Sequence, residues 1–201
     1  FIQYDFFKLL EESKCTNKST GWIPNHIIIK EKNSIVGLIP NFKKLNSFGE
    51  YIFDHTFEHA YYQVGSDYFP KYLSGIPFTP VTRLKFIYGK HHIDYEKLAK
   101  LLVNFLEESR ASSFHANFID ANTSKTLEKC NFVQRVGIQY HWTNKNFENF
   151  NDFLNSMKSR KKNNIIKERN FLKDQDINFV NKEGDDIEEK DIYNLYECYI
   201  K

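Results

Sequence analysis

Strand-like and helix-like segments alternate along this chain, and this alternation most constrains its fold. Apolar runs at 26–30 and 35–40, separated by the polar EKNS, predict a hairpin, and further strands are predicted at 83–88, 112–119, 132–143 and 177–181. Helical spacing of apolar residues predicts helices at 4–14, 94–109, 123–130, 149–173 and from about 188. Such interleaving predicts an α/β or α+β domain with a mixed sheet flanked by helices.

The composition is that of a chain with a packed core. Hydrophobic residues make up 41% of the 201 residues, with nineteen Phe and twelve Tyr, which argues against general disorder. No apolar run approaches the roughly 20 residues that span a bilayer. Three scattered cysteines, Cys15, Cys130 and Cys198, favour a reducing compartment, so we predict a cytoplasmic protein. Phe1 and the uncapped helical pattern before Lys201 lead us to expect a fragment.

One segment carries a strong local charge. Residues 156–173 hold seven basic side chains and one acidic one, although the whole chain has a net charge of only +2. On one continuous helix from 149 to 173, Lys162 and Arg169 fall on an exposed stripe that suits a polyanion, and Arg160 projects elsewhere. Lys161 falls in the apolar arc, where we expect it to meet an acid such as Glu168 or a ligand phosphate. An ordinary solvated helix face remains the alternative.

Polar side chains within the predicted strands are candidate substrate-binding residues. His115 and His141 lie in the strands at 112–119 and 132–143, where a hydrogen-bonded core histidine is the alternative to a functional one. Arg135 and Gln139 are four residues apart and would share one face of a strand. On a cleft wall, Arg135 would bind an anion or a carboxylate.

The segment HTFEH at 55–59 matches the H-x-x-E-H pattern of inverted zinc peptidases, in which two histidines bind one metal from one helix face. The sequence identifies no third ligand, so we predict no metal and keep a zinc peptidase as a remote alternative. No phosphate-binding glycine motif is present. The stretch 45–82 contains many aromatic residues and three prolines, and we expect it to be irregular and to line a cleft.

Six motifs, in this order, resemble one family. TGWIPNHIII, SFGEYIFD, YYQVGSDYFPKYLSGIPFTPVT, SSFHANF, VGIQYHWTN and FNDFLNSMKSRKKNNIIKER are similar to the FemAB-like group of GNAT-fold proteins, labelled peptidoglycan biosynthesis/recognition or uncharacterised N-acetyltransferase. The resemblance implies a first GNAT-like domain at 1–175 and the opening strand and helix of a truncated second one at 176–201. The chain departs from the family at His55, which stands in a Trp position, at His59, which stands in an Asp position, and at PVTRL, which lacks a Gly-Pro.

The resemblance also implies an enzyme that transfers an acyl or aminoacyl group to an amine of a cell-wall precursor or peptide. The amine would attack the activated carbonyl directly, with Glu50 or Asp54 as the general base. For these two carboxylates, a role in capping turns is the alternative. The predicted substrate-binding residues are Tyr51, Thr79, Arg83, His115, Arg135, Gln139, His141, Trp142, Arg160, Lys161, Lys162 and Arg169.

The donor is open between acyl-CoA and aminoacyl-tRNA. FIYGKHHIDYEK stands where GNAT proteins carry a glycine-rich pyrophosphate loop and has a single glycine, which argues against coenzyme A. The basic segment suits tRNA or another anionic ligand, such as a diphosphate-linked precursor, and gives no reason to expect DNA. The competing class is a GNAT-fold module that binds an anionic ligand without chemistry.

Overall fold

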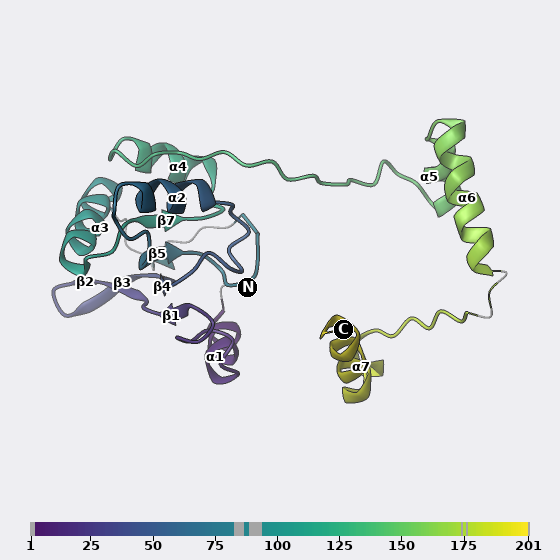
Figure 1. Ribbon diagram of the computed structural model, residues 1–201, viewed down its shortest axis with the longest axis horizontal. Helices are drawn as coiled ribbons and strands as arrows, with labels where there is room; N and C mark the ends of the chain where they lie inside the picture. The colour runs from purple at the N-terminus through teal and green to yellow at the C-terminus, as the bar shows by residue number, and fades with distance from the viewer. Residues whose placement is uncertain (1–2, 83–86, 89–93, 174, 176, 201) are drawn as a thin grey trace. The chain divides into compact units, whose positions relative to one another are not determined.

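The computed structural model describes residues 3–82, 87–88, 94–173, 175 and 177–200. The chain divides into two compact units, Phe1–Gly137 and Ile138–Lys201, and each is described by itself (Figure 1). These units are the parts of the chain with the most contacts within themselves. The predicted boundary at 175/176 separates something else, a first GNAT-like domain from the beginning of a second one. That boundary stays a prediction.

The first unit is built on two small sheets. One has the order β1-β4-β5-β7, in which β5 and β7 are parallel and the other pairs are antiparallel. The other is antiparallel, with the order β2-β3-β6. The strands are β1 (Trp22–Pro24), β2 (Ile27–Glu31), β3 (Ser34–Ile39), β4 (Phe42–Lys44), β5 (Lys71–Ser74), β6 (Ile87–Tyr88) and β7 (Phe114–Ala116).

Helices cover these sheets and supply part of the core. They are α1 (Tyr4–Glu12), α2 (His55–Gln63), α3 (Tyr95–Ser109) and α4 (Ala121–Glu128). Leu98 and Leu102 on α3 and Leu127 on α4 pack with Tyr72 of β5 and Phe114 of β7 in one buried cluster. The first unit is therefore a mixed α+β structure, as predicted, and its closer likeness to GNAT proteins stays an expectation.

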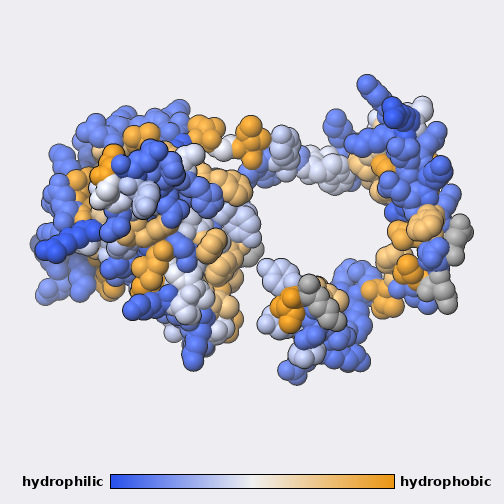
Figure 2. All heavy atoms as spheres, in the orientation of Figure 1, coloured by the Kyte–Doolittle hydropathy of each residue, from blue (hydrophilic) through white to orange (hydrophobic). Residues whose placement is uncertain are grey.

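The second unit is helical in the part that the structure describes. It contains α5 (Phe150–Asn155), α6 (Ser159–Lys173), the short 3-10 helix η1 (Gly184–Asp186) and α7 (Glu189–Ile200). Figure 2 shows hydrophilic residues over most of the visible face of α6. Among the described residues, no helix is both long and apolar enough to cross a membrane.

Several predicted elements are confirmed and others are wrong. The helices α1, α3, α4 and α7 and the hairpin β2-β3 lie where the patterns placed them. The predicted strands at 132–143 and 177–181 are not formed, and the stretch 45–82 contains the unpredicted α2 and β5. The predicted basic helix is interrupted between Asn155 and Ser159. Alternation of apolar residues makes a segment suitable for a strand, but a strand forms only against a partner edge.

Replacing Asp94 with Ala should lower the free energy of unfolding by about 1 kcal/mol. The Asp94 side chain accepts hydrogen bonds from the backbone N–H groups of Glu96 (2.9 Å) and Lys97 (3.2 Å), which have no partner inside helix α3. Urea denaturation measures the change, with Lys100→Ala on the exposed face of α3 as the control. Equal stability of the two variants would contradict a capping role for Asp94.

Candidate functional site

Four charged side chains are buried together in the first unit, and we call them the buried charge cluster: Lys44, Glu50, Asp54 and Lys71. All four side chains have no exposed surface. Lys44 and Lys71 lie opposite each other on the antiparallel strands β4 and β5, so they share one face of the sheet. Two ammonium groups so placed repel each other in an interior of low dielectric constant. The carboxylates of Glu50 and Asp54 supply the opposite charge that this pair needs.

The two carboxylates come from the connection between β4 and α2. Gly49 turns this connection with a φ of +74°, and a Cβ there would lie 2.6 Å from the Phe78 ring, so only glycine fits. Tyr51 also has a positive φ and points to solvent. Asp54 occupies the N-cap position of α2, yet its side chain makes no capping hydrogen bond. Its carboxylate contacts Lys71 instead, so the turn-capping alternative does not describe Asp54.

Lys71 lies at the centre of the cluster. Its ammonium donates hydrogen bonds to Glu50 Oε2 at 3.0 Å, to Asp54 Oδ2 and to Ser47 Oγ at 3.0 Å. All three of its donors are therefore used. The bonds join β5 to both ends of the segment 47–54, so Lys71 holds this segment against the sheet.

Lys44 is held differently. Its Nζ lies 3.5 Å from the centroid of the Trp22 ring and donates to the Phe48 carbonyl oxygen at 3.2 Å. Trp22 Nε1 donates to the same carbonyl at 2.9 Å. Its ion pair is with Glu50 Oε1, at 3.8 Å. Lys44 thus gains a cation–π contact and only a long ion pair.

The cluster continues through Tyr68 to His115 on β7. Tyr68 donates its hydroxyl hydrogen bond to Asp54 Oδ2 at 2.7 Å. His115 Nε2 lies 3.5 Å from the Tyr68 hydroxyl and 2.9 Å from Ser113 Oγ. The histidine predicted from the strand pattern therefore lies beside the predicted general bases, in partly buried surroundings.

The environment separates the pKa values of the two carboxyl groups. Burial raises the pKa of Glu50, and the nearby Lys71 and Lys44 offset this only in part. Burial would also raise the pKa of Asp54, but hydrogen bonds from Lys71 and Tyr68 outweigh it and lower the pKa to about 2. Burial lowers the pKa of Lys44 to about 7, against the opposing effect of Glu50. Asp54 is thus held as an anion, whereas Glu50 is the better proton acceptor near neutral pH.

Two oxygen atoms of the cluster retain unused hydrogen-bonding capacity. Glu50 Oε1 and Asp54 Oδ1 are buried and accept no hydrogen bond within the part of the chain that the structure describes. A buried carboxylate oxygen without a donor is costly, and in native proteins it has a specific cause, such as a catalytic role or a bound water. Glu50 therefore has a raised pKa and an oxygen, Oε1, that accepts no hydrogen bond from the described residues and is paired only with the Lys44 ammonium at 3.8 Å.

The other residues predicted in the first unit lie around this segment. Arg135 Nη2 donates to the Phe53 carbonyl oxygen at 3.2 Å, and its Cζ lies 4.7 Å from the Phe57 ring centroid. Arg135 therefore packs on the segment that carries Glu50 and Asp54. Thr79 donates to the Pro77 carbonyl oxygen at 3.0 Å, in a turn of its own. Arg83 lies outside the described residues.

The residues predicted at 139–142 lie in the second unit. His141 Nε2 is 3.2 Å from Gln139 Oε1, and both side chains are exposed, as is Trp142. The prediction that Arg135 and Gln139 share one strand face is wrong, because this segment forms no strand. His141 is likewise not a strand residue.

In the basic helix, the exposure of Lys161 and Lys162 differs from the prediction. Lys161 is exposed, as are Arg160 and Glu168, so the inward placement of Lys161 is wrong. Lys162, predicted on the exposed stripe, is half-buried and donates to Asn155 Oδ1 at 2.7 Å. No residue of α6 is buried within the described part of the chain, so its apolar side offers Lys161 no packed surface to face, and Lys162 bonds across the interruption between α5 and α6. Arg169 is exposed, and its Cζ lies 4.5 Å from the Phe150 ring centroid.

HTFEH lies in helix α2 with both histidines exposed. His55 Nδ1 lies 3.8 Å from Glu58 Oε2, and His59 is one turn further along the helix. In the described part of the chain, no group of three or more His, Cys, Asp or Glu could hold a metal ion. The third ligand that the zinc alternative needs is therefore missing among these residues.

Sequence reasoning missed both lysines of the cluster, together with Tyr68 and Trp22. The available signal was KYLS at 71–74, a lysine at the start of an otherwise buried strand. A charged residue in a buried strand calls for a charged partner. The sequence alone does not show which residue is that partner, because this depends on the register between β4 and β5 and on the connection that follows β4.

The chain also matches a known protein family. Residues 1–201 match the family described as FemAB-like, peptidoglycan biosynthesis/recognition. Comparison with curated proteins and with solved structures gives no match. The family match covers the segment that carries Glu50 and Asp54 as well as the basic helix. The chain therefore belongs to the FemAB-like family of peptidoglycan biosynthesis and recognition proteins.

Proposed function

We propose that this chain transfers an acyl or aminoacyl group to an amine of a cell-wall precursor or peptide, with Glu50 as the proton acceptor. Membership of the FemAB-like family supports a role in peptidoglycan biosynthesis. The observation that carries the proposal is a buried pair of unlike carboxylates: Glu50, whose Oε1 accepts no hydrogen bond from the described residues and whose pKa is raised, and Asp54, which bonds Lys71 and whose pKa is lowered. Such a separation is typical of sites where one carboxylate exchanges a proton and the other stays charged.

The proposed reaction joins an amine to an activated carbonyl. The amine nitrogen attacks the carbonyl carbon, so that a C–N bond forms and the C–O bond of an aminoacyl ester or the C–S bond of an acyl thioester breaks. The nitrogen loses one proton to Glu50 Oε1, and Glu50 returns that proton to the leaving alkoxide or thiolate. Backbone N–H groups would polarise the carbonyl. Asp54, Lys71 and Tyr68 act as positioning residues for Glu50.

Access to Glu50 is part of the proposal. The Glu50 side chain has no exposed surface, whereas Phe48, Tyr51 and Phe53 of the same segment are 73%, 57% and 83% exposed. An amine therefore reaches Glu50 only when this segment moves outward. The exposed aromatic rings are the part of the segment that a bound substrate would contact first.

Full burial of both carboxylates also favours a second candidate, a binding module without chemistry. A charge cluster that never opens would serve only to hold the segment 47–54 in place. The chain would then recognise an anionic cell-wall precursor through its surface. This candidate predicts binding of precursors with no transfer from any donor.

Replacing Glu50 with Gln should lower the rate of transfer by about 100-fold or more, because the amide cannot accept the proton. The substitution keeps the shape of the side chain, so the far-ultraviolet circular dichroism should be unchanged. Turnover is measured with acyl-CoA and aminoacyl-tRNA as donors and cell-wall precursors as acceptors.

The matched control is Glu58→Gln, which changes an exposed glutamate on α2 and should leave turnover unchanged. Equal turnover of Glu50→Gln and the unaltered protein would remove Glu50 from the mechanism. Precursor binding without transfer by the unaltered protein would favour the binding module.

A further inference from the structure

A groove in the first unit lies between helix α1 and the end of the hairpin where β2 begins and β3 ends. It is lined by one side of α1 and by His26, Leu38 and Pro40, and we call it the α1 groove. Its volume is about 490 Å³, which is the size of a site for a small molecule. None of its lining residues belongs to the buried charge cluster or takes part in the proposed reaction.

The apolar part of the α1 groove is held in place by rings that contact one another. Phe7 stacks on the buried Phe42 with ring centroids 6.3 Å apart, and it meets the His26 ring edge to face at 5.7 Å. His26 meets Phe42 in the same way at 5.3 Å. Pro40 is buried, and Leu38 is 36% exposed. Because the three rings pack on one another, the apolar surface that they form with Leu38 is rigid.

The carboxylate of Glu11 is fixed beside this apolar surface. His26 Nδ1 accepts a hydrogen bond from the Asn41 N–H at 3.2 Å, so this nitrogen carries no proton. The proton of the ring is therefore on Nε2, which lies 3.3 Å from Glu11 Oε1 and donates to it. In this arrangement the histidine is a neutral donor, which positions the carboxylate and leaves it negatively charged.

The α1 groove carries an excess of negative charge. Its charged lining residues are Lys8, Glu11 and Glu12. Lys8 Nζ lies 3.8 Å from Glu12 Oε1, one turn along the helix, so these two charges offset each other. None of the lysines and arginines that the structure describes forms an ion pair with Glu11. The Glu11 side chain is 45% exposed, so a cation from solution can reach it.

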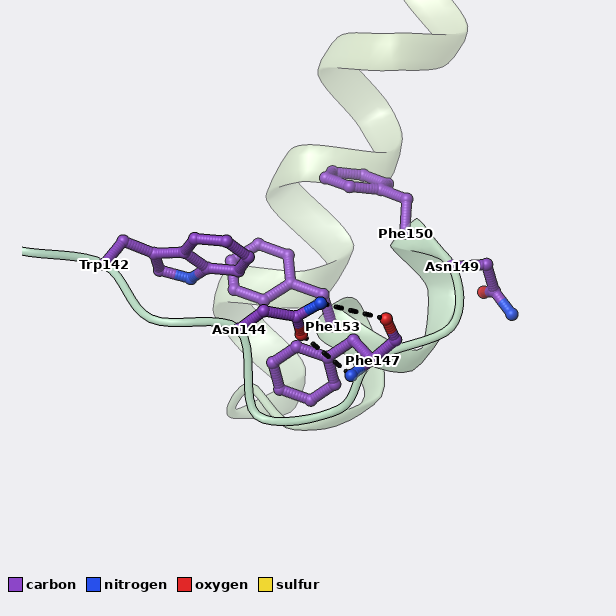
Figure 3. A pocket seen from close by; sticks show the side chains of 6 residues that line it. All are labelled: Trp142, Asn144, Phe147, Asn149, Phe150 and Phe153. Atoms are coloured by element: carbon purple, nitrogen blue, oxygen red, sulfur yellow. Dashed lines mark hydrogen bonds between the residues drawn. The ribbon is translucent and has the colours of Figure 1, made fainter.

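A charged lining distinguishes the α1 groove from a pocket in the second unit. That pocket is lined by two asparagines and four aromatic residues, Trp142, Phe147, Phe150 and Phe153 (Figure 3). Asn144 bonds to the Phe147 backbone, and Asn149 caps α5. Its lining contains no charged residue, whereas the α1 groove places one carboxylate beside an apolar surface.

We propose that the α1 groove binds a small organic ammonium ion that has an apolar body. The ammonium pairs with Glu11 and lies against the ring of Tyr4, which also lines the groove. The apolar body contacts Phe7, Leu38 and Pro40. An anion of the same shape is repelled, because the groove is negatively charged. Failure of this site would leave the proposed transfer chemistry standing, since the groove shares no residue with the buried charge cluster.

The test is an amide chemical-shift titration of the full 201-residue chain labelled with nitrogen-15. The probes are phenethylamine, phenethyl alcohol, hydrocinnamate and methylamine. Phenethylamine should bind at least about tenfold more tightly than each of the other three. The alcohol has the same body without the charge, hydrocinnamate has the opposite charge, and methylamine has the charge without the body. The amides of α1, His26 and Leu38 should be among those that shift.

Paired variants locate the ammonium group. Glu11→Gln should weaken phenethylamine binding by about tenfold. Glu31→Gln, which makes the same change at an exposed residue at the end of β2, should change affinity by less than about twofold. Lys8→Met should tighten binding by about threefold, because it removes the positive charge that offsets Glu12. A loss of structure would not produce opposite effects in the two groove variants, and circular dichroism checks that each variant keeps its helices.

Three results would overturn the proposal. The first is no shift of the groove amides with phenethylamine at concentrations up to about 10 mM. The second is binding of phenethyl alcohol, hydrocinnamate or methylamine as tight as that of phenethylamine, or an unchanged affinity in Glu11→Gln. The third is a dimer of the free protein, seen by sedimentation velocity and lost in Tyr4→Ala, which would make the groove an interface between two copies of the chain.

Discussion

Replacing Lys71 with Met should lower the free energy of unfolding by about 3–5 kcal/mol, which is a large part of the roughly 5–15 kcal/mol that stabilises a typical protein. Lys71 is the only described cation within hydrogen-bonding distance of both carboxylates of the cluster. Without it, Glu50 and Asp54 are buried with one distant ammonium, 3.8 Å from Glu50 Oε1. Urea denaturation followed by circular dichroism measures the loss.

Two further variants make this result interpretable. Lys43→Met removes a neighbouring lysine that is only half-buried on β4, and it should change stability by no more than about 0.5 kcal/mol. Combining Lys71→Met with Glu50→Gln and Asp54→Asn removes the uncompensated charges and should recover part of the loss. A Lys71→Met protein as stable as the Lys43→Met protein would show that the cluster is not held together by Lys71.

Lowering the pH from 7 to 4 should remove up to about 3 kcal/mol of stability through His115. Burial lowers the pKa of His115 from 6.5 to about 4, with Lys71 and Arg135 acting in the same direction and Asp54 against them. Between these two values the unfolded chain binds a proton that the folded protein does not bind. Protonation therefore favours the unfolded state, and the loss begins below pH 6.5 and is complete near pH 4.

The measurement is a series of urea denaturations between pH 7 and pH 4. In His115→Gln the decline over this range should be shallower, because the titrating group is gone. His59→Gln, which changes an exposed histidine on α2, should keep the decline of the unaltered protein. An identical pH dependence in all three proteins would exclude His115 as its cause. A further decline below pH 4 is expected from Asp54, whose pKa is lowered from 3.8 to about 2.

Much of the fold and part of the site could be predicted from the sequence. The hairpin β2-β3 and helix α3 depend on neighbouring residues only, through apolar periodicity and the Asp94 cap. Glu50 and Asp54 are candidates because they lie in the stretch predicted to line a cleft, and the transfer chemistry assigned to them follows from the resemblance to one family, which is confirmed. Nothing in the sequence separates the roles of the two carboxylates. The lowered pKa of Asp54 depends on Tyr68 and Lys71, which lie 14 and 17 residues away along the chain, and the raised pKa of Glu50 depends on its burial in the folded protein.

The sequence by itself determined the family, the mixed α+β class and the elements whose signals are local. Only the tertiary structure placed Lys44 opposite Lys71 and brought two carboxylates between them, because strand register is set by long-range packing. It also showed that Lys161 is exposed, because no residue of α6 is buried within the described part of the chain, and that Lys162 is half-buried, because it bonds Asn155 across the break between α5 and α6. Local periodicity specifies which face of one element is apolar. The charged side chains that contact one another are determined by how that element packs against the other elements.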